Sequence, residues 1–358
     1  MTKAVSGPLK LSIKALAVAA LLVQGAACAV AAAGECRKEG DPKDNVEACH
    51  KALSNGGKLD DGQFIRLHMA LAANLTKLKK FGEAMNSYSL ILKRDPKNIE
   101  ALLGRADLHL LSGQAGKAFT DYSRVIELDP RNARAHMGRA IVWQFRNKPE
   151  HALKDMDAAL QGDPQNPRLN YQKASLLLRM NKPREAINHF NKTIFADPND
   201  VDAHEGRAAA WMRLGDWANA ANNLGVAIRL RPDRASLYEK RARAYWMLGR
   251  KEKALADLSM LVRLKPNHPR PLIDRGIVRA RMGRYKDALA DLARAEKMAG
   301  PNPSIHYFRA RAWEKLNRPR ADIIAEYEKA LKATATSMAD ARARMEADKR
   351  LKELKALK

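Results

Sequence analysis

The sequence predicts an all-α protein built as an array of about eight helical hairpins. Its composition is rich in Ala, Leu, Arg and Lys, and only 6% of the 358 residues are aromatic, which is typical of helices rather than sheets. Beyond residue 64 a short pattern recurs, namely an Ala, a bulky residue four positions later, and a Pro eight positions after that. The prolines of the pattern are evenly spaced along the chain. Such a fixed period indicates a repeat array rather than several globular domains.

Residues 1–33 differ from the rest of the chain. Three lysines precede an apolar stretch from Ala15 to Val23, and small residues follow as far as Ala33. This is the order of segments in a secretory signal peptide cleaved near Ala33, and the stretch is too short for a membrane span. We expect a periplasmic or secreted protein with no transmembrane segment in the mature chain. The alternative, a lipoprotein anchored at Cys28, is disfavoured because Gly25 stands where such signals usually carry Leu.

Residues 34–64 are interpreted as an N-terminal strap followed by a partial repeat. After cleavage the chain keeps two cysteines, Cys36 and Cys49. In an oxidising compartment a disulfide between them is the expected state. A free buried thiol and a metal ligand are the alternatives, but the pair Cys49-His50 lacks the paired spacing of a metal site. We therefore expect no bound metal.

Residues 65–332 carry the repeated pattern. Its instances are Ala84/Tyr88/Pro96, Ala118/Tyr122/Pro130, Ala152/Met156/Pro164, Ala186/Phe190/Pro198, Ala220/Leu224/Pro232 and Ala254/Leu258/Pro266, with Ala288/Leu292 and Tyr327/Ala330 continuing the series. The period and the pattern resemble the tetratricopeptide repeat. That resemblance implies eight units, each a pair of antiparallel helices, stacked into a right-handed α-solenoid.

The residues themselves explain why such units would form. Alanines on both helices, such as Ala140 and Ala152, would let the two backbones approach closely. Glycines fall at the predicted turn between the helices, where a positive φ is favourable; they are Gly113, Gly215, Gly249 and Gly283. Aromatic residues recur in the same columns and are interpreted as core; they are Trp143, Trp211, Tyr245, Trp313, Tyr122 and Phe190.

Residues 333–358 are interpreted as a basic amphipathic helix that caps the last repeat. Apolar residues recur among charges, and they are Met338, Ala341, Met345, Leu351 and Leu354. A helix with such a stripe would cover the apolar face that the last hairpin leaves open. A membrane-surface helix is the weaker alternative, because four acids interrupt seven basic residues.

One column of charges predicts ion pairs between helices. An Arg on the first helix is followed, at one constant interval, by an Asp on the second, in Arg105/Asp121, Arg139/Asp155, Arg241/Asp257 and Arg275/Asp291. In the last repeat Arg309 is followed by Glu326 one position beyond that interval, as a one-residue insertion would require. We expect these arginines to be structural.

The resemblance also implies a binding groove. In tetratricopeptide proteins the exposed positions of the first helices line a concave groove that takes peptides or partner helices. Here those positions hold Arg134, Arg168, Tyr171, Gln172, Arg179, Arg213, Lys240, Arg243, Trp246, Arg270, Arg281, Tyr307 and Arg311, and they share the face with Asp202, Glu205, Glu239, Asp274 and Glu314. Members that clamp a C-terminal carboxylate use Lys and Asn where this chain has Met69 and Ala73, so that ligand class is not supported.

No motif in the sequence predicts catalysis. A phosphate-binding loop and a serine elbow are absent, and the nine histidines are scattered without metal spacing; His136 and His204 share one repeat column and are interpreted as structural. The net charge of +25 favours anionic partners, and export excludes nucleic acid. We expect a non-catalytic scaffold without cofactor that binds an acidic protein or peptide. Recognition of an anionic envelope polysaccharide, or assembly of a polysaccharide secretion machine, is the alternative, and charge that only keeps the array soluble is the simplest explanation of all.

Overall fold

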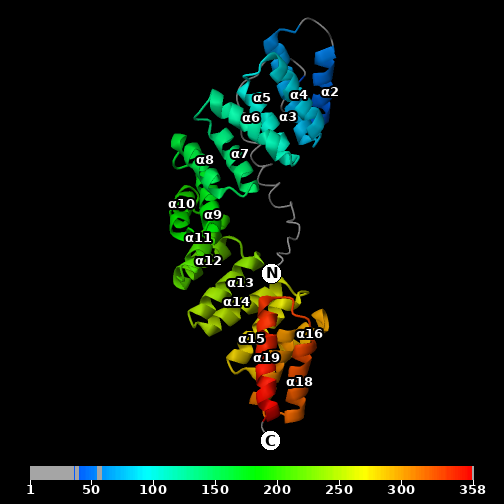
Figure 1. Cartoon of the computed structure of the whole chain (residues 1–358), viewed down its shortest axis with the longest axis vertical. Coiled ribbons are helices and arrows are strands. Elements are labelled where there is room, and N and C mark those ends of the chain that lie inside the picture. Colours follow the sequence, from blue (N-terminus) through cyan, green and yellow to red (C-terminus); the bar gives the residue numbers. More distant parts are fainter. Residues whose placement is uncertain (1–35, 37–39, 55–58, 357–358) are drawn as a thin grey trace. The chain divides into compact units, whose positions relative to one another are not determined.

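The computed structural model describes residues 36, 40–54 and 59–356, and the predicted signal peptide lies outside these residues. All secondary structure in the described part is helical, from α2 to α19 (Figure 1). The helices divide into two compact units, unit 1 up to Leu176 and unit 2 from Leu177 to Lys358. Within each unit consecutive helices pack as antiparallel pairs. The predicted all-α repeat fold is confirmed.

First and second helices of the hairpins alternate along the chain. In unit 1 the helices are α2 (Pro42–Ser54), α3 (Asp61–Lys77), α4 (Phe81–Arg94), α5 (Ile99–Leu111), α6 (Ala115–Leu128), α7 (Ala133–Phe145) and α8 (Pro149–Gly162). The unit boundary falls inside α9 (Pro167–Arg179). In unit 2 they are α10 (Pro183–Ala196), α11 (Val201–Arg213), α12 (Trp217–Leu230), α13 (Ala235–Met247), α14 (Lys251–Leu264), α15 (Pro269–Arg281), α16 (Tyr285–Ala299), α17 (Pro303–Lys315), α18 (Arg320–Lys332) and α19 (Met338–Ala356).

The first hairpin begins earlier than residue 65, the start predicted for the repeats. Asp60 caps helix α3 by accepting a hydrogen bond from the Gln63 amide at 2.7 Å, and the Gln63 side chain accepts one from the Asp60 amide at 3.2 Å. This reciprocal capping box satisfies two amides that a helix terminus otherwise leaves without partners. It therefore fixes the helix start at Asp61.

Alanine contacts and left-handed turns shape each hairpin as predicted. Ala152, Ala186 and Ala220 have no exposed surface, so an added methylene there would meet a neighbouring helix. The four turn glycines have φ between 71° and 81°. The other turns place Lys79, Asn147, Asn181 and Asn317 at the same repeat position with positive φ. Asn tolerates this region better than most residues do, which explains three of the four substitutions.

At three of the junctions a second close contact joins one hairpin to the next. Built on Gly138 of α7, a Cβ atom would stand 2.3 Å from the Tyr122 ring of α6. Gly104 faces Tyr88, and Gly206 faces Phe190, in the same way. Each glycine follows its ring at the same interval along the sequence, and where the ring is replaced by Met156, Leu224 or Leu258 the glycine is replaced too. These glycines are therefore required because a side chain would clash with the neighbouring ring, whereas the turn glycines are required by their positive φ.

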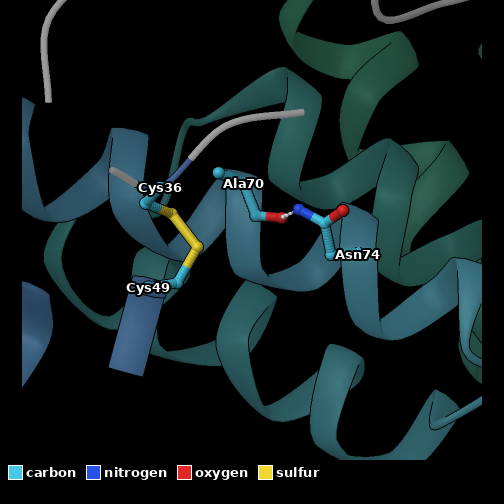
Figure 2. Close-up of a disulfide and its surroundings, with 4 residues drawn as sticks. All are labelled: Cys36, Cys49, Ala70 and Asn74. Atoms are coloured by element: carbon cyan, nitrogen blue, oxygen red, sulfur yellow. Dashed lines mark hydrogen bonds between the residues drawn. A yellow bond between two sulfur atoms is a disulfide. The ribbon is translucent and has the colours of Figure 1, made fainter. Parts of the chain in front are cut away.

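At the N-terminal end, α2 packs against α3. Cys36 and Cys49 form a disulfide that ties the preceding segment to α2, as Figure 2 shows. Cys49 is fully buried beside the core of α3 and α4. In α3 the Asn74 amide donates a hydrogen bond to the Ala70 carbonyl at 2.9 Å (Figure 2).

At the C-terminal end, α19 packs against both α17 and α18. Its buried face consists of Asp340, Ala343, Ala347, Leu351 and Leu354. The stripe expected from the sequence is correct only for its C-terminal half, because Met338 is 91% exposed and Met345 is 72% exposed. Asp340 is buried instead, and it accepts a hydrogen bond of 2.6 Å from the hydroxyl of Ser304 on α17. Asp340 thus lies on the same buried face as the two alanines and two leucines.

Candidate functional site

The predicted column of arginines is structural. Arg105 of α5 donates two hydrogen bonds of 2.8 Å to Asp121 of α6 and a third, of 3.3 Å, to Ser89 of α4. Arg139 repeats the arrangement with Asp155 and Ser123. The same pairing occurs in Arg241/Asp257, Arg275/Asp291 and Arg309/Glu326. Each guanidinium is paired with an acid of its own hairpin, and Arg105, Arg139 and Arg309 also bond to the preceding second helix, so these arginines are structural.

The histidines of the shared column are also structural. His136 and His204 bond through Nε2 to the carbonyls of Pro130 and Pro198, at 3.0 Å and 2.9 Å. Each thereby holds the loop before its own helix. Asn170 donates to the Pro164 carbonyl at 3.0 Å in the equivalent place. None of these three side chains requires a catalytic explanation.

In unit 1 the expected groove residue Arg134 is engaged internally. Its guanidinium donates to Asp107 at 2.5 Å and lies 3.7 Å from Glu100. Asp107 is only 3% exposed and also accepts a 2.5 Å hydrogen bond from the Tyr122 hydroxyl. Such a buried carboxylate needs its partners, because an uncompensated buried charge is costly. Arg134 therefore stabilises unit 1.

Two tyrosines complete this buried network. Burial raises the pKa of Tyr88 to about 12, and the Asp107 carboxylate adds to the effect. Burial and the same carboxylate raise the pKa of Tyr122. Both phenols therefore stay protonated at neutral pH, and the Tyr122 hydroxyl donates to Asp107. Asp107, the acid nearest to Arg134 in the structure, was not predicted from the sequence.

The remaining expected groove residues of unit 1 lie on α9. Arg168, Tyr171 and Gln172 are half-buried there. Burial lowers the pKa of the Arg168 guanidinium, which nevertheless stays charged at neutral pH. On the other side of the unit boundary, Arg179 is exposed at the end of the same helix.

In unit 2 the first helices meet through ion pairs. Lys240 of α13 bonds to Glu205 of α11, and Arg234 at the start of α13 lies 2.7 Å from the same carboxylate. On α15, Arg270 donates to Asp274 at 3.0 Å. Burial raises the pKa of Asp274, and its neighbours Glu239 and Asp340 add to this while Arg270 opposes it. Lys240 and Arg270 are therefore largely occupied by acids of the same face.

Three arginines of unit 2 are exposed and have no such acid partner. Among the described residues no carboxylate lies within 4.0 Å of Arg213, Arg243 or Arg281. Arg213 makes one long hydrogen bond, of 3.4 Å, to Asn181. Arg213 and Arg281 occupy equivalent repeat positions, whereas Arg243 lies one helical turn earlier and Met247 takes the equivalent place on α13. The cations are therefore staggered rather than aligned in a single column.

Aromatic rings accompany these arginines. The guanidinium of Arg281 on α15 lies 5.6 Å from the Trp246 ring of α13 and 5.5 Å from the Phe308 ring of α17. Arg243 lies 6.0 Å from the Trp217 ring. A cation within about 6 Å of a ring is attracted to its face. Phe308 was not among the expected residues; it stands one repeat after Asp274, in the column that holds Gly104, Gly138 and Gly206 in earlier repeats.

The last expected residues, Tyr307 and Arg311, lie on α17 next to the terminal helix. Tyr307 is half-buried against the core of α17 to α19. Arg311 lies 3.8 Å from Glu314, which also accepts a 3.0 Å hydrogen bond from Arg350 of α19. This end of the face is thus partly covered by the chain itself.

No group of three His, Cys, Asp or Glu side chains in the part of the chain that is described is arranged to hold a metal ion. None of the described helices is both long enough and apolar enough to cross a membrane.

Family models described as tetratricopeptide repeat match residues 171–225, 212–269 and 244–313. No curated protein sequence matches the chain. Among solved structures, a tetratricopeptide repeat protein from Parabacteroides merdae is similar with a TM-score of 0.50 and 19% identity, over 70% of this chain and 99% of that one. PilW, a type IV pilus biogenesis factor, is similar with a TM-score of 0.50 and 20% identity, over 57% of this chain and 94% of that one. At this identity the two structures support the fold alone.

Proposed function

The chain is a tetratricopeptide repeat protein, and from this premise we propose that it is a non-catalytic scaffold of the periplasm or cell envelope that binds an acidic protein segment. The proposed binding surface lies on the first helices of unit 2. We call it the arginine face, and it consists of Arg213, Arg243, Trp246, Arg281 and Phe308. The observation that carries the proposal is Arg281, an exposed cation that lies between two rings and has no carboxylate of its own.

In the proposed complex, the charged residues would mainly increase the rate of association, and the aromatic residues would supply most of the affinity. Exposed ion pairs contribute only about 0 to 1 kcal/mol each, but a basic surface steers an acidic partner and accelerates association. Aromatic anchors carry most of the affinity in a protein interface. Trp246 and Phe308 supply such anchors beside the cations. An acidic segment that also carries large apolar side chains fits this combination best.

The partner is to be identified by affinity capture. Mature protein is immobilised and exposed to envelope extract at two salt concentrations, and retained proteins are identified by mass spectrometry. The proposal predicts that an acidic protein is retained by the wild type and lost with Trp246→Ala. Retention of the same protein by that variant would contradict the role of the face, and capture of an anionic polysaccharide in place of protein would favour the alternative ligand class.

The two contributions separate by their salt dependence. Trp246→Ala should weaken binding at both salt concentrations by a similar factor, because an apolar contact is little affected by screening. Serine substitution of an arginine should weaken binding mainly at low salt, where exposed charges interact over longer distances. Isothermal titration calorimetry of the captured partner measures both effects.

A further inference from the structure

A cavity in unit 1 opens where one repeat position carries an unusual residue. Trp143, Trp211 and Trp313 share a column of the first helices, and His109 of α5 stands in that column one repeat before Trp143. The cavity has a volume of about 390 Å³ and is lined by Ser89, Arg105, His109, Lys117, Thr120 and Asp121. It lies between α4, α5 and α6, and it is separate from the arginine face.

The next hairpin shows what fills the equivalent place. There the Trp143 ring lies 4.8 Å from Phe119 and 4.7 Å from His151. The guanidinium of Arg146 covers both Phe119 and Trp143, at 4.2 Å and 5.6 Å from their rings. One repeat earlier, the smaller His109 and Ser112 replace Trp143 and Arg146. The cavity therefore opens beside His109, in a repeat where the larger Trp143 is replaced.

The lining of the cavity is positively charged. Asp121 is neutralised by its double hydrogen bond with Arg105. Lys117 is exposed, and within the described residues it pairs with no carboxylate. A neighbouring cavity of about 300 Å³ shares Ser89 and Arg105 and adds Lys93, which is also exposed. The positive charges of Lys117 and Lys93 therefore have no carboxylate partner among the described residues.

Hydrogen-bonding groups and apolar surface complete the site. The imidazole of His109 forms part of the wall of the cavity. The Ser89 hydroxyl accepts from Arg105 at 3.3 Å, so its own proton remains available to an acceptor. Leu92, Pro96 and Leu102 line the neighbouring cavity.

We propose that these adjoining cavities bind a small organic acid. Its carboxylate lies against Lys117 and Ser89, beside the His109 ring, and its apolar part lies against Leu92 and Leu102. A carboxylate supplies acceptors for the lysine and the hydroxyl, and it balances the excess charge. The apolar part prefers the leucines to water. No covalent step is involved.

The test uses the mature full chain and benzoate as the probe. Benzoate titrated into the protein, with histidine imidazoles followed by NMR, should shift the His109 signals saturably while those of the exposed His50 and His268 stay unchanged. Benzyl alcohol, which has the ring but no charge, should bind at least tenfold more weakly. Absence of a saturable shift at His109, or equal binding of the two probes, would overturn the proposal.

Two variants locate the site. His109→Trp restores the residue that three other repeats carry, so it should fill the cavity, preserve the fold and reduce benzoate affinity at least tenfold in calorimetry. Lys117→Gln alters an exposed side chain and should reduce the affinity severalfold, whereas Lys154→Gln, on the following hairpin, should leave it unchanged. Folded His109→Trp protein that binds benzoate as the wild type does would contradict the assignment, as would equal losses for the two lysine variants.

Discussion

Arg134 of unit 1 and Arg281 of unit 2 both stand on first helices at positions where the family places binding residues, but their surroundings differ. Arg134 is bound to Asp107 and lies near Glu100. Arg281 is exposed and lies beside two aromatic rings. The first cation holds its own unit together, and the second is available to another molecule. Neighbours rather than residue type therefore decide which arginines belong to a binding surface.

The largest expected effect is on stability, from loss of the Arg134 guanidinium. Arg134→Ala would leave the Asp107 carboxylate buried without its cation, which should lower the free energy of unfolding of unit 1 by about 3 kcal/mol or more. Arg281→Ala should change stability by less than about 0.5 kcal/mol, as exposed substitutions usually do. Hydrogen exchange of α5 to α7 and of α13 to α17 measures the two units separately.

A double variant checks the reason for that difference. Arg134→Met combined with Asp107→Leu removes both charges and should recover most of the lost protection, because the penalty comes from the unpaired carboxylate. Equal protection losses in Arg134→Ala and Arg281→Ala would mean that the two arginines do not differ in the way the contacts indicate.

A second difference concerns how the two ends are closed. Unit 1 ends in a disulfide between Cys36 and Cys49, which are 13 residues apart. Unit 2 ends in α19, which is held by packing and by hydrogen bonds such as Ser304 to Asp340. A loop of this length stabilises the folded state by about 3 kcal/mol at most in the chain-entropy model. Reduction should therefore lower the thermal stability of α2 and α3 and leave α17 to α19 unchanged.

Peptide mapping without reducing agent provides the direct check on the disulfide. A linked pair of peptides that contains Cys36 and Cys49 is expected from the purified mature protein. Two thiols that react freely with an alkylating agent would contradict the bond.

A smaller effect is expected from acid, and it should be confined to the end of unit 2. Burial alone would raise the pKa of Glu326, but hydrogen bonds from His306 and the charge of Arg309 lower it below its ordinary 4.5. A carboxyl group with a depressed folded-state pKa contributes stability above its unfolded-state pKa and loses it as the pH falls. Hydrogen exchange of α17 and α18 should therefore speed up as the pH falls below about 4.5, after correction for the intrinsic rate.

Glu326→Gln is the matched control for this pH dependence. The variant should be less stable than the wild type at neutral pH, and the difference should shrink in acid because its amide does not titrate. If the difference in stability between the wild type and Glu326→Gln is the same at neutral and acid pH, Glu326 is not the source of the pH dependence.

The sequence predicted the hairpins because both helices, the turn and the terminating proline recur with one period. The constant spacing of the charged column was enough to pair Arg105 with Asp121, since two residues at fixed places on two packed helices must meet in every repeat. The turn residues Asn147 and Asn181 could have been found in the same way, because Asn147 stands one repeat after Gly113 and Asn181 one repeat before Gly215.

Contacts that occur in one repeat only could not be predicted from the period. Asp107 bonds to Arg134 across 27 residues, and the residues at its equivalent positions in the next two repeats, Ile141 and Ser175, carry no charge. The exposure of Met338 was missed because the buried face of α19 runs through Asp340, Ala343 and Ala347, and Met338 and Met345 lie off that face. Such side-chain partners depend on three-dimensional packing that the repeat pattern leaves open.

The most direct test of the account compares two triple variants of unit 2 with equal charge. One changes Arg213, Arg243 and Arg281 on the first helices to Ser, and the other changes Arg229, Arg263 and Arg294, which are exposed on second helices. The affinity for the captured acidic partner is measured by calorimetry over a range of salt. The account predicts that the first variant binds at least tenfold more weakly at low salt with a flatter salt dependence, while the second retains nearly wild-type affinity. Equal losses in the two variants would show that net charge alone attracts the partner and that the arginine face has no special role.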